Sequence, residues 1–312
     1  RLLRQQRVPV EGAERGLAHV AVARPELDAA DPASVEAALV AHQPWAVVNT
    51  AGYVRVDEAE HEREACWREN VCAAAVLARA CAEHGARLAT FSTDLVFDGG
   101  RHGRAYTEDD AVRPLNAYGA SKAEAERLVL AAHPSALVLR TAAFFGPVDE
   151  WNFLTIALRE LAAGREFQAL ADVHVSPTYV PALADATLDL LVDGERGVWH
   201  LANDVADDAA PTWYDFARLG AERAGLDADG VRPLALEHAG LAAVRPRWSV
   251  LGSTRGRLLG PLENAICHYL RARPWPVPAD AARAPAARAT PAVAARASVR
   301  RRTPHAASSS YP

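Results

Sequence analysis

The sequence predicts an α/β fold in which a doubly wound parallel sheet is followed by a smaller mixed α/β region. Two observations lead to this prediction. Over the first 145 residues, short β-branched runs alternate with longer alanine-rich stretches, and after residue 146 the alternation becomes less regular. Strand–helix alternation of this kind is typical of parallel βαβ units with helices on both faces of the sheet.

The first region contains the clearer elements. The expected strands are residues 19–23, 45–49, 87–92 and 136–141. Apolar residues at three-to-four spacing predict helices over 32–42, 63–84 and 118–133. Asp31 followed by Pro32 is a typical helix start, and Gly85 stands where a left-handed helix end is expected.

The second region is predicted with fewer strands. Helices are expected over residues 152–163, 181–192 and 213–224, and a strand over 198–202. From about residue 273 the chain is rich in Ala, Pro, Arg and Ser, which cannot bury enough apolar surface to offset the entropy of ordering. We therefore expect domains at 1–145 and 146–271 and a disordered tail over 272–312.

Composition excludes several classes of protein. The chain has 312 residues and a net charge of −5, and no run of 18 apolar residues predicts a membrane span. Residues 1–270 carry −12 and the tail +7, so the acidic body does not suit nucleic-acid binding. The four cysteines have no zinc-type spacing and there is no secretory signal, so we expect free thiols, no metal and a cytoplasmic location.

The only lysine of the chain, Lys122, lies four residues after Tyr118 in a predicted helix. Residues at this spacing share one helix face, and an ammonium near a phenol is expected to lower the pKa of the tyrosine. Tyr118 would then act as a general acid toward a carbonyl or as a base toward an alcohol. The alternative is an exposed tyrosine beside an exposed lysine.

Other polar residues follow the predicted strands. Ser92, Thr93 and Asp94 come at the end of one strand, where open α/β sheets collect their catalytic groups. The alternative for them is a turn capped by polar side chains. Small residues at 49–52 end another strand, and Asn70 stands inside a helical run as a poor helix former, or as a partly exposed polar position.

Several separated motifs together resemble a known family. They are NTAGYVRVDEAE (49–60), STDLVFDG (92–99), PLNAYGASK (114–122), SPTYVPALAD (176–185), GVWHL (197–201) and WYDFA (213–217). Over residues 17–270 the chain resembles the extended short-chain dehydrogenase/reductases, and within them the dTDP-4-dehydrorhamnose reductase branch. The resemblance implies a Rossmann-like sheet that binds NAD or NADP.

The resemblance also implies residue roles. Tyr118 would protonate the C4 carbonyl oxygen of a nucleotide-linked 4-keto sugar, with Lys122 and Thr93 as its catalytic partners. Substrate contacts are expected from Thr93, Asp94 and Ala143, although the branch usually has tryptophan where this chain has Ala143. The expected cofactor-binding residues are Asp28, Ala29, Gly52, Tyr53, Val54, Phe91, Tyr118 and Lys122.

The largest departure from the family concerns its glycine-rich turn, G-x-x-G-x-x-G, which binds the cofactor pyrophosphate. Before Asn49 the chain contains only Gly12 and Gly16, and no strand precedes them. We therefore expect the first strand to be missing, residues 1–17 to be a remnant of the first helix, and dinucleotide affinity to be poor. The chain also has no methionine, so we expect it to lack its natural N-terminus.

The predicted function is an NAD(P)H-dependent reductase of a nucleotide-linked 4-keto-6-deoxy sugar in deoxysugar synthesis. Arg24 favours NADPH slightly, because a guanidinium suits a 2′-phosphate. One alternative is a non-catalytic binding or regulatory module of the same fold, and another is an epimerase or dehydratase of the superfamily. The expected partner is the nucleotide sugar, without nucleic acid or membrane; a longer fusion chain and a homodimer both stay open.

Overall fold

The computed structural model describes residues 17–205, 210–273 and 275. Its centre is a parallel sheet of order β1-β2-β3-β7, formed by Ala46–Asn49, Arg87–Thr93, Leu137–Thr141 and Gly197–His200. The register pairs Ala46 with Arg87, Ala89 with Leu137, and Leu137 with Gly197. The predicted parallel sheet is thereby confirmed, and β7 joins it from the segment 146–271.

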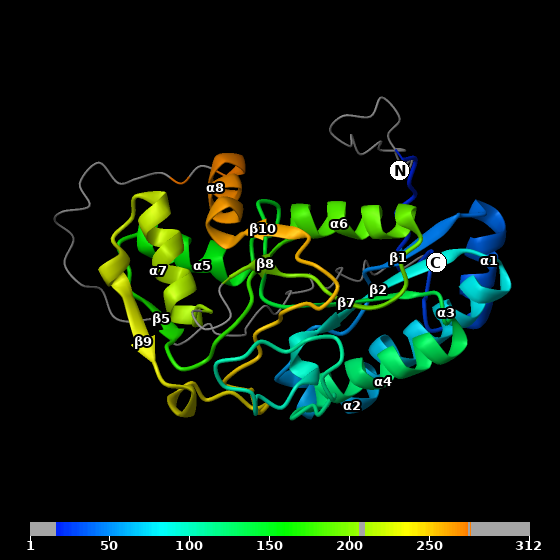
Figure 1. The fold of residues 1–312 in the computed structure, drawn as a ribbon, viewed down its shortest axis with the longest axis horizontal. Helices are drawn as coiled ribbons and strands as arrows, with labels where there is room; N and C mark the ends of the chain where they lie inside the picture. The colour runs from blue at the N-terminus through cyan, green and yellow to red at the C-terminus, as the bar shows by residue number, and fades with distance from the viewer. Residues whose placement is uncertain (1–16, 206–209, 274, 276–312) are drawn as a thin grey trace, which may run out of the picture.

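Helices cover both faces of this sheet, as a doubly wound fold requires. Figure 1 shows α6 (Val180–Asp193) on one side and α2 (Arg63–Trp67), α3 (Ala73–Glu83) and α4 (Ala117–Ala132) on the other. Successive strand residues point to opposite faces. Accordingly Leu88 and Val138 are buried with α3 and α4, whereas Ala89, Leu137 and Leu139 are buried with α6.

The first helix among the described residues has the predicted bounds. α1 covers Pro32–His42, and the Asp31 side chain accepts a hydrogen bond from the Ala33 amide at its start. The predicted helix 63–84 is present, but its middle, Arg68–Cys72, is a π-helical segment, η2, between α2 and α3. Gly85 follows α3 with φ +66°, as a left-handed helix end requires.

One predicted strand is wrong. Residues 19–23 form no strand, and Val20 is 47% exposed. A strand needs a hydrogen-bonded neighbour, and among the described residues β1 pairs with β2 alone, so the sheet ends at β1. The predicted remnant of a first helix at residues 1–17, with Gly12 and Gly16, lies outside the described residues except for Leu17.

The smaller region lies at the other end of the molecule, where Figure 1 shows α5, α7 and α8 together. Its helices are α5 (Phe153–Ala162), α7 (Trp213–Ala224) and α8 (Leu262–Ala272), with short helices η4 (Ala228–Gly230) and η5 (Leu236–His238). Short parallel pairs join β4 (Phe144–Phe145) to β6 (Thr178–Tyr179), β5 (Phe167–Leu170) to β9 (Val231–Leu234), and β8 (Asn203–Asp204) to β10 (Leu259–Pro261). The remaining short helices are η1 (Glu58–Glu60) and η3 (Asp94–Val96).

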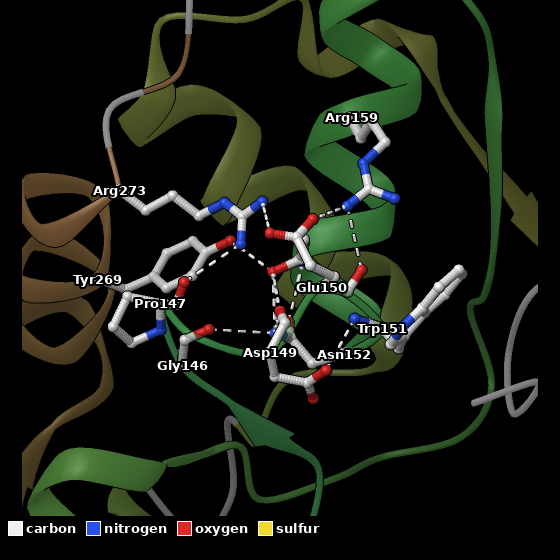
Figure 2. Close-up of polar contacts among 10 residues, drawn as sticks. Gly146, Pro147, Asp149, Glu150, Trp151, Asn152, Arg159, Tyr269 and Arg273 are labelled. Carbon is white, nitrogen blue, oxygen red and sulfur yellow. Dashed lines mark hydrogen bonds and ion pairs between the residues drawn. The ribbon is translucent and has the colours of Figure 1, made fainter. Parts of the chain in front are cut away.

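A hydrogen-bonded loop connects β4 to α5 (Figure 2). Asn152 caps α5 by accepting from the Thr155 amide at 2.9 Å and donates to the carbonyls of Gly146 and Asp149. Glu150 pairs with Arg159 of α5 and with Arg273, just past α8. These contacts tie the loop after β4 to the start of α5 and to the end of α8.

The helices predicted in the second region, and the absence of disulfides, agree with the structure. The helices predicted over 152–163, 181–192 and 213–224 are present as α5, α6 and α7. No disulfide joins the four cysteines, as predicted. None of the helices in the described part of the chain has the length and apolar run that a membrane span requires. The predicted tail, 272–312, lies outside the described residues except for residues 272, 273 and 275.

Candidate active site

The polar residues singled out in the sequence meet at the carboxyl ends of β1 and β2, beside the start of α4. Asn116 caps α4 by accepting from the Gly119 amide at 2.7 Å, which fixes the turn that carries Tyr118. A side chain at Gly119 would collide with the carbonyl oxygen of Leu95 in η3. The glycine between Tyr118 and Lys122 therefore lets α4 pack closely against the end of β2.

Thr93 and Asp94 form the floor of this site, and both are buried. The Thr93 hydroxyl donates to Asp94 Oδ1 at 3.1 Å and accepts from the Leu95 amide at 3.2 Å. The alternative of a capped turn is thus also true, because Thr93 caps η3. A capping role does not remove Thr93 from the site, since its hydroxyl lies close enough to Tyr118 to oppose the rise of the tyrosine pKa.

Lys122 is directed into the site from the second turn of α4. Its ammonium donates to the Phe91 carbonyl at 3.1 Å and lies 6.0 Å from the centre of the Tyr118 ring. Burial lowers the pKa of Lys122 to about 8, although the nearby Cys66 and Glu126 act in the opposite direction. The alternative of an exposed lysine is wrong, because the side chain is largely enclosed by β2 and α4.

The predicted lowering of the Tyr118 pKa is wrong for the protein alone. Burial, and then the charge of Asp94, raise the pKa of Tyr118 above its usual value. The ammonium of Lys122 bonds to a backbone carbonyl rather than to the phenol, so it does not reverse this shift. Tyr118 is consequently protonated at neutral pH, as a proton donor must be.

Asp94 has a shifted pKa for a related reason. Burial raises the pKa of its carboxyl to about 6, while hydrogen bonds from Ser249 and Thr93 act in the opposite direction. A buried acid beside the phenol of a tyrosine that lines a cavity is a typical feature of functional sites.

Sequence reasoning underestimated Asn70, which is 3% exposed. From the π-helical segment η2, its side chain accepts from the Tyr53 amide at 2.8 Å and donates to the Tyr53 carbonyl and to the Ser121 hydroxyl. It therefore links the loop after β1 to α4 between Tyr118 and Lys122. A helix-disfavouring asparagine inside a helical run was the available signal. In the structure it lies on a π-helical segment, a feature that is frequent at functional sites.

A cavity of about 420 Å³ opens beside Tyr118 and Lys122. Its walls are mostly apolar and come from the open edge of β1, the loop after it, and α6. They include Val48, Ala51, Gly52, Val54, Phe91, Phe144, Val180, Leu183 and Ala184. Phe145 belongs to the core, whereas its neighbour Phe144 is 44% exposed and lines the cavity.

The structure brings most of the predicted residues together. Gly52, Val54, Phe91, Tyr118 and Lys122 all line the cavity. Thr93 and Asp94 do not line it, but both act on the Tyr118 phenol that does. The backbone passes so close at Gly52 that a Cβ there would lie 2.9 Å from the Asn70 side chain.

The other predicted residues lie elsewhere. Tyr53 is buried, and its hydroxyl donates to Glu62 at 2.9 Å. Asp28 pairs with Arg68 at 2.5 Å, and Ala29 packs near α1 and α3, so neither lines the cavity. Ala143 has φ +42° and packs against the buried group that includes Val96 and Trp248.

The site suits one end of a dinucleotide better than the other. The apolar wall beside Tyr118 and Lys122, with close backbone approach at Gly52, can accept a flat ring and its ribose. Residues 17–51 contain no glycine, so this part of the chain offers no glycine-rich turn for a pyrophosphate. The described residues therefore fit the nicotinamide end of the cofactor.

Comparison with known proteins gives concordant results. A model of the RmlD substrate binding domain family matches residues 6–265. The dTDP-4-keto-6-deoxy-D-glucose reductase of Streptomyces niveus is 35% identical over 242 residues, which cover 77% of this chain and 82% of that protein. A dTDP-4-dehydrorhamnose reductase of Mycobacterium tuberculosis is 36% identical over 255 residues, with coverage of 80% and 82%.

Among solved structures, a dTDP-4-dehydrorhamnose reductase from Bacillus anthracis in complex with NADP is similar. Its TM-score is 0.74 at 29% identity, and the match covers 79% of this chain and 87% of that chain. The corresponding reductase from Clostridium acetobutylicum has a TM-score of 0.73 at 29% identity, with coverage of 78% and 86%.

Proposed function

The chain belongs to the RmlD substrate binding domain family, and on that premise we propose that it is an NAD(P)H-dependent reductase of a dTDP-linked 4-keto-6-deoxy sugar. The observation that carries the proposal is the Tyr118–Lys122 pair, which faces an apolar cavity beside Thr93 and Asp94. Its sequence relatives named as reductases of such sugars support this substrate class.

In this proposal Tyr118 is the general acid. Its phenol is protonated at neutral pH, because burial and Asp94 raise its pKa. When bound, a reduced nicotinamide supplies the hydride that reduces the sugar carbonyl carbon. Tyr118 would donate its proton to the carbonyl oxygen, so that the ketone becomes an alcohol.

Lys122 and Thr93 support that proton transfer. The Lys122 ammonium stabilises the phenolate that remains after Tyr118 has given up its proton, and it holds the cofactor ribose. The Thr93 hydroxyl orients the phenol and the carbonyl oxygen. Asp94 and Ala143 border the sugar, and the small side chain of Ala143 leaves room there.

For the cofactor we propose contacts with Gly52, Val54 and Phe91 along the cavity and with the Tyr53 backbone. Asp28 and Ala29 would lie near the adenine. In this proposal NADPH is preferred over NADH, because the half-exposed guanidinium of Arg24 would contact the 2′-phosphate. In the protein alone Arg24 pairs with Glu69 at 2.9 Å. Residues 1–145 would form the cofactor domain and 146–271 the substrate region, in a cytoplasmic enzyme.

A non-catalytic module of the same fold is the second candidate. The observation that favours it is the absence of glycine from residues 17–51, which removes a pyrophosphate-binding turn from this stretch. Such a module would bind the nucleotide sugar without turning it over.

One assay separates the two candidates. The full chain is incubated with NADPH or NADH and dTDP-4-dehydrorhamnose, while cofactor oxidation and the reduced sugar are measured. We expect both products to appear, faster with NADPH, and to fall to background in Tyr118→Phe. Sugar-nucleotide binding without turnover above the Tyr118→Phe background would support the module and contradict the reductase.

A further inference from the structure

One turn beyond Lys122, α4 carries a second buried charge, Glu126, which is 6% exposed. Its carboxylate accepts from Arg140 Nε at 2.9 Å and Nη2 at 2.7 Å, in a two-point pair across to β3. Arg140 itself is 3% exposed and also lies 3.3 Å from His200 Nε2. A carboxylate buried this deeply is stable only because these donors surround it.

Glu126 also contacts β2, next to the residue that Lys122 contacts. The Ser92 hydroxyl donates to Glu126 Oε1, and the Lys122 ammonium donates to the carbonyl of the preceding residue, Phe91. Two successive turns of α4 thus bind two successive residues of β2. This pairing fixes the height of α4 along the strand, and with it the position of Tyr118.

The groups facing Lys122 differ in charge at neutral pH. From α2 comes Cys66, whose thiol stays neutral because burial raises its pKa. From α4 come Tyr118, also protonated, and Glu126. Asp94 acts on Tyr118, and Arg140 is paired with Glu126. Among the described residues acting on Lys122, Glu126 is therefore the one with a negative charge at neutral pH.

We propose that Glu126 is a positioning residue: its buried carboxylate accepts from Ser92, next to the Phe91 carbonyl that Lys122 contacts, and so holds the Lys122 ammonium beside Tyr118 and favours its charged form. The role of Lys122 in turnover rests on the proposed function, but the coupling between Glu126 and Lys122 does not. Glu126 itself touches neither the cavity beside Tyr118 nor the reacting atoms.

The sequence offers a direct test, because Lys122 is the only lysine among 312 residues. Labelling the full chain with lysine carrying ¹³C at Cε gives one side-chain resonance, which reports the protonation of Lys122 alone. We expect the wild-type resonance to titrate near pH 8. In Glu126→Gln the midpoint should fall by about one pH unit or more, because an opposite charge is lost.

The matched control is Glu160→Gln. Glu160, on α5, also forms a two-point pair with an arginine: it accepts from Arg165 at 2.6 and 2.9 Å. Its loss should leave the Lys122 midpoint unchanged. An equal midpoint in wild type and Glu126→Gln would overturn the proposal.

A second variant covers failure of Glu126→Gln to fold, since that change leaves Arg140 unpaired in the core. The double variant Glu126→Gln, Arg140→Leu removes both charges. Its Lys122 midpoint should still lie below the wild-type value, because Glu126, and not Arg140, is among the groups that act on Lys122. A wild-type midpoint in the double variant overturns the proposal as well.

Turnover gives a separate measurement. If the chain is a reductase, the basic limb of its kcat profile should move to lower pH in Glu126→Gln by the same amount as the resonance. A shifted resonance in a chain without reductase activity would support the role of Glu126 and contradict the proposed function. If the Lys122 resonance does not shift in Glu126→Gln but the chain is an active reductase, the role of Glu126 is contradicted and the proposed function is supported.

Discussion

The inner face of α4 has two halves that differ in the partners of their charged groups: one half contains an ion pair, and the other does not. In the half around Glu126, the carboxylate receives hydrogen bonds from Ser92 and Arg140, and the pair is almost fully buried. In the half around Tyr118, Lys122 has a neutral carbonyl as its hydrogen-bond acceptor. Asp94 has the hydroxyls of Ser249 and Thr93 as its side-chain hydrogen-bond partners.

The pKa values follow this difference. Burial brings the pKa of Lys122 down to about 8 and the pKa of Asp94 up to about 6. Charges held in a direct ion pair serve stability, whereas charges in a cleft that lack one remain available to a substrate. Glu126 acts on Lys122 without forming an ion pair with it. Neighbouring turns of one helix therefore have different tasks: the turn at Glu126 stabilises the fold, and the turns at Tyr118 and Lys122 serve the site.

The largest expected effect is on turnover in the Tyr118 half. Tyr118→Phe removes the proton donor, so we expect kcat to fall by about 10²- to 10⁴-fold. The unfolding free energy should fall by no more than about 1 kcal/mol, because the phenol loses only its hydrogen bond with the Thr93 hydroxyl. Steady-state kinetics and urea unfolding of the same preparation measure both quantities.

Tyr269→Phe is the matched control for that change. Tyr269, labelled in Figure 2, is a buried tyrosine of the smaller region. Its hydroxyl lies 2.8 Å from the Thr155 hydroxyl. Its loss should cost about 1 kcal/mol of stability and leave kcat unchanged. Equal kcat values for the two variants would contradict the role given to Tyr118.

The next effect is on stability in the Glu126 half. Arg140→Leu leaves the Glu126 carboxylate buried without its ion pair, which should lower the unfolding free energy by about 3–5 kcal/mol. Arg127→Leu, which breaks the exposed pair with Glu124, should cost at most about 0.5 kcal/mol. Similar losses in the two variants would mean that the Glu126 half is not the compensated one.

A smaller and pH-dependent effect is expected at Asp94. The folded protein holds this proton more tightly than the unfolded chain, whose reference pKa is 3.8. The stability that Asp94 contributes is therefore present below pH 3.8 and lost as the pH rises through about 6. At neutral pH Asp94→Asn should raise the unfolding free energy by up to about 3 kcal/mol.

Urea unfolding at neutral pH and again below pH 3.8 tests this prediction. The gain from Asp94→Asn should vanish at the lower pH, where the wild-type carboxyl is protonated in both states. A loss of stability at neutral pH would show that Asp94 is compensated after all.

Helix bounds and the relative placement of Tyr118 and Lys122 could be predicted from the sequence, but not the position of every strand. Helices α1 and α7 have the predicted bounds because local signals set them, namely Asp31 and Pro32 at one start and Gly225 at one end. The i, i+4 spacing placed Tyr118 and Lys122 on one face because helix geometry alone decides that. The strand expected at 19–23 failed, since a strand depends on a neighbour that its own sequence does not encode.

The electrostatics of the site could not be predicted from spacing. The direction of the Tyr118 pKa depends on burial and on Asp94, which are consequences of how η3 packs against α4. Glu126 was missed although it stands four residues after Lys122, on the inner face of the same helix. Its importance becomes visible only when β3 brings Arg140 opposite it.

The most direct test of the contrast is Lys122→Met, followed by both unfolding and turnover at neutral pH. The stability that Lys122 contributes is present above pH 10.5 and lost as the pH falls through about 8, so its charge destabilises the protein at neutral pH. We predict that Lys122→Met is more stable by about 1–3 kcal/mol and has no reductase activity. A variant that is less stable than wild type, or one that keeps full turnover, would contradict the view that Lys122 is a charge without an ion pair, held for chemistry.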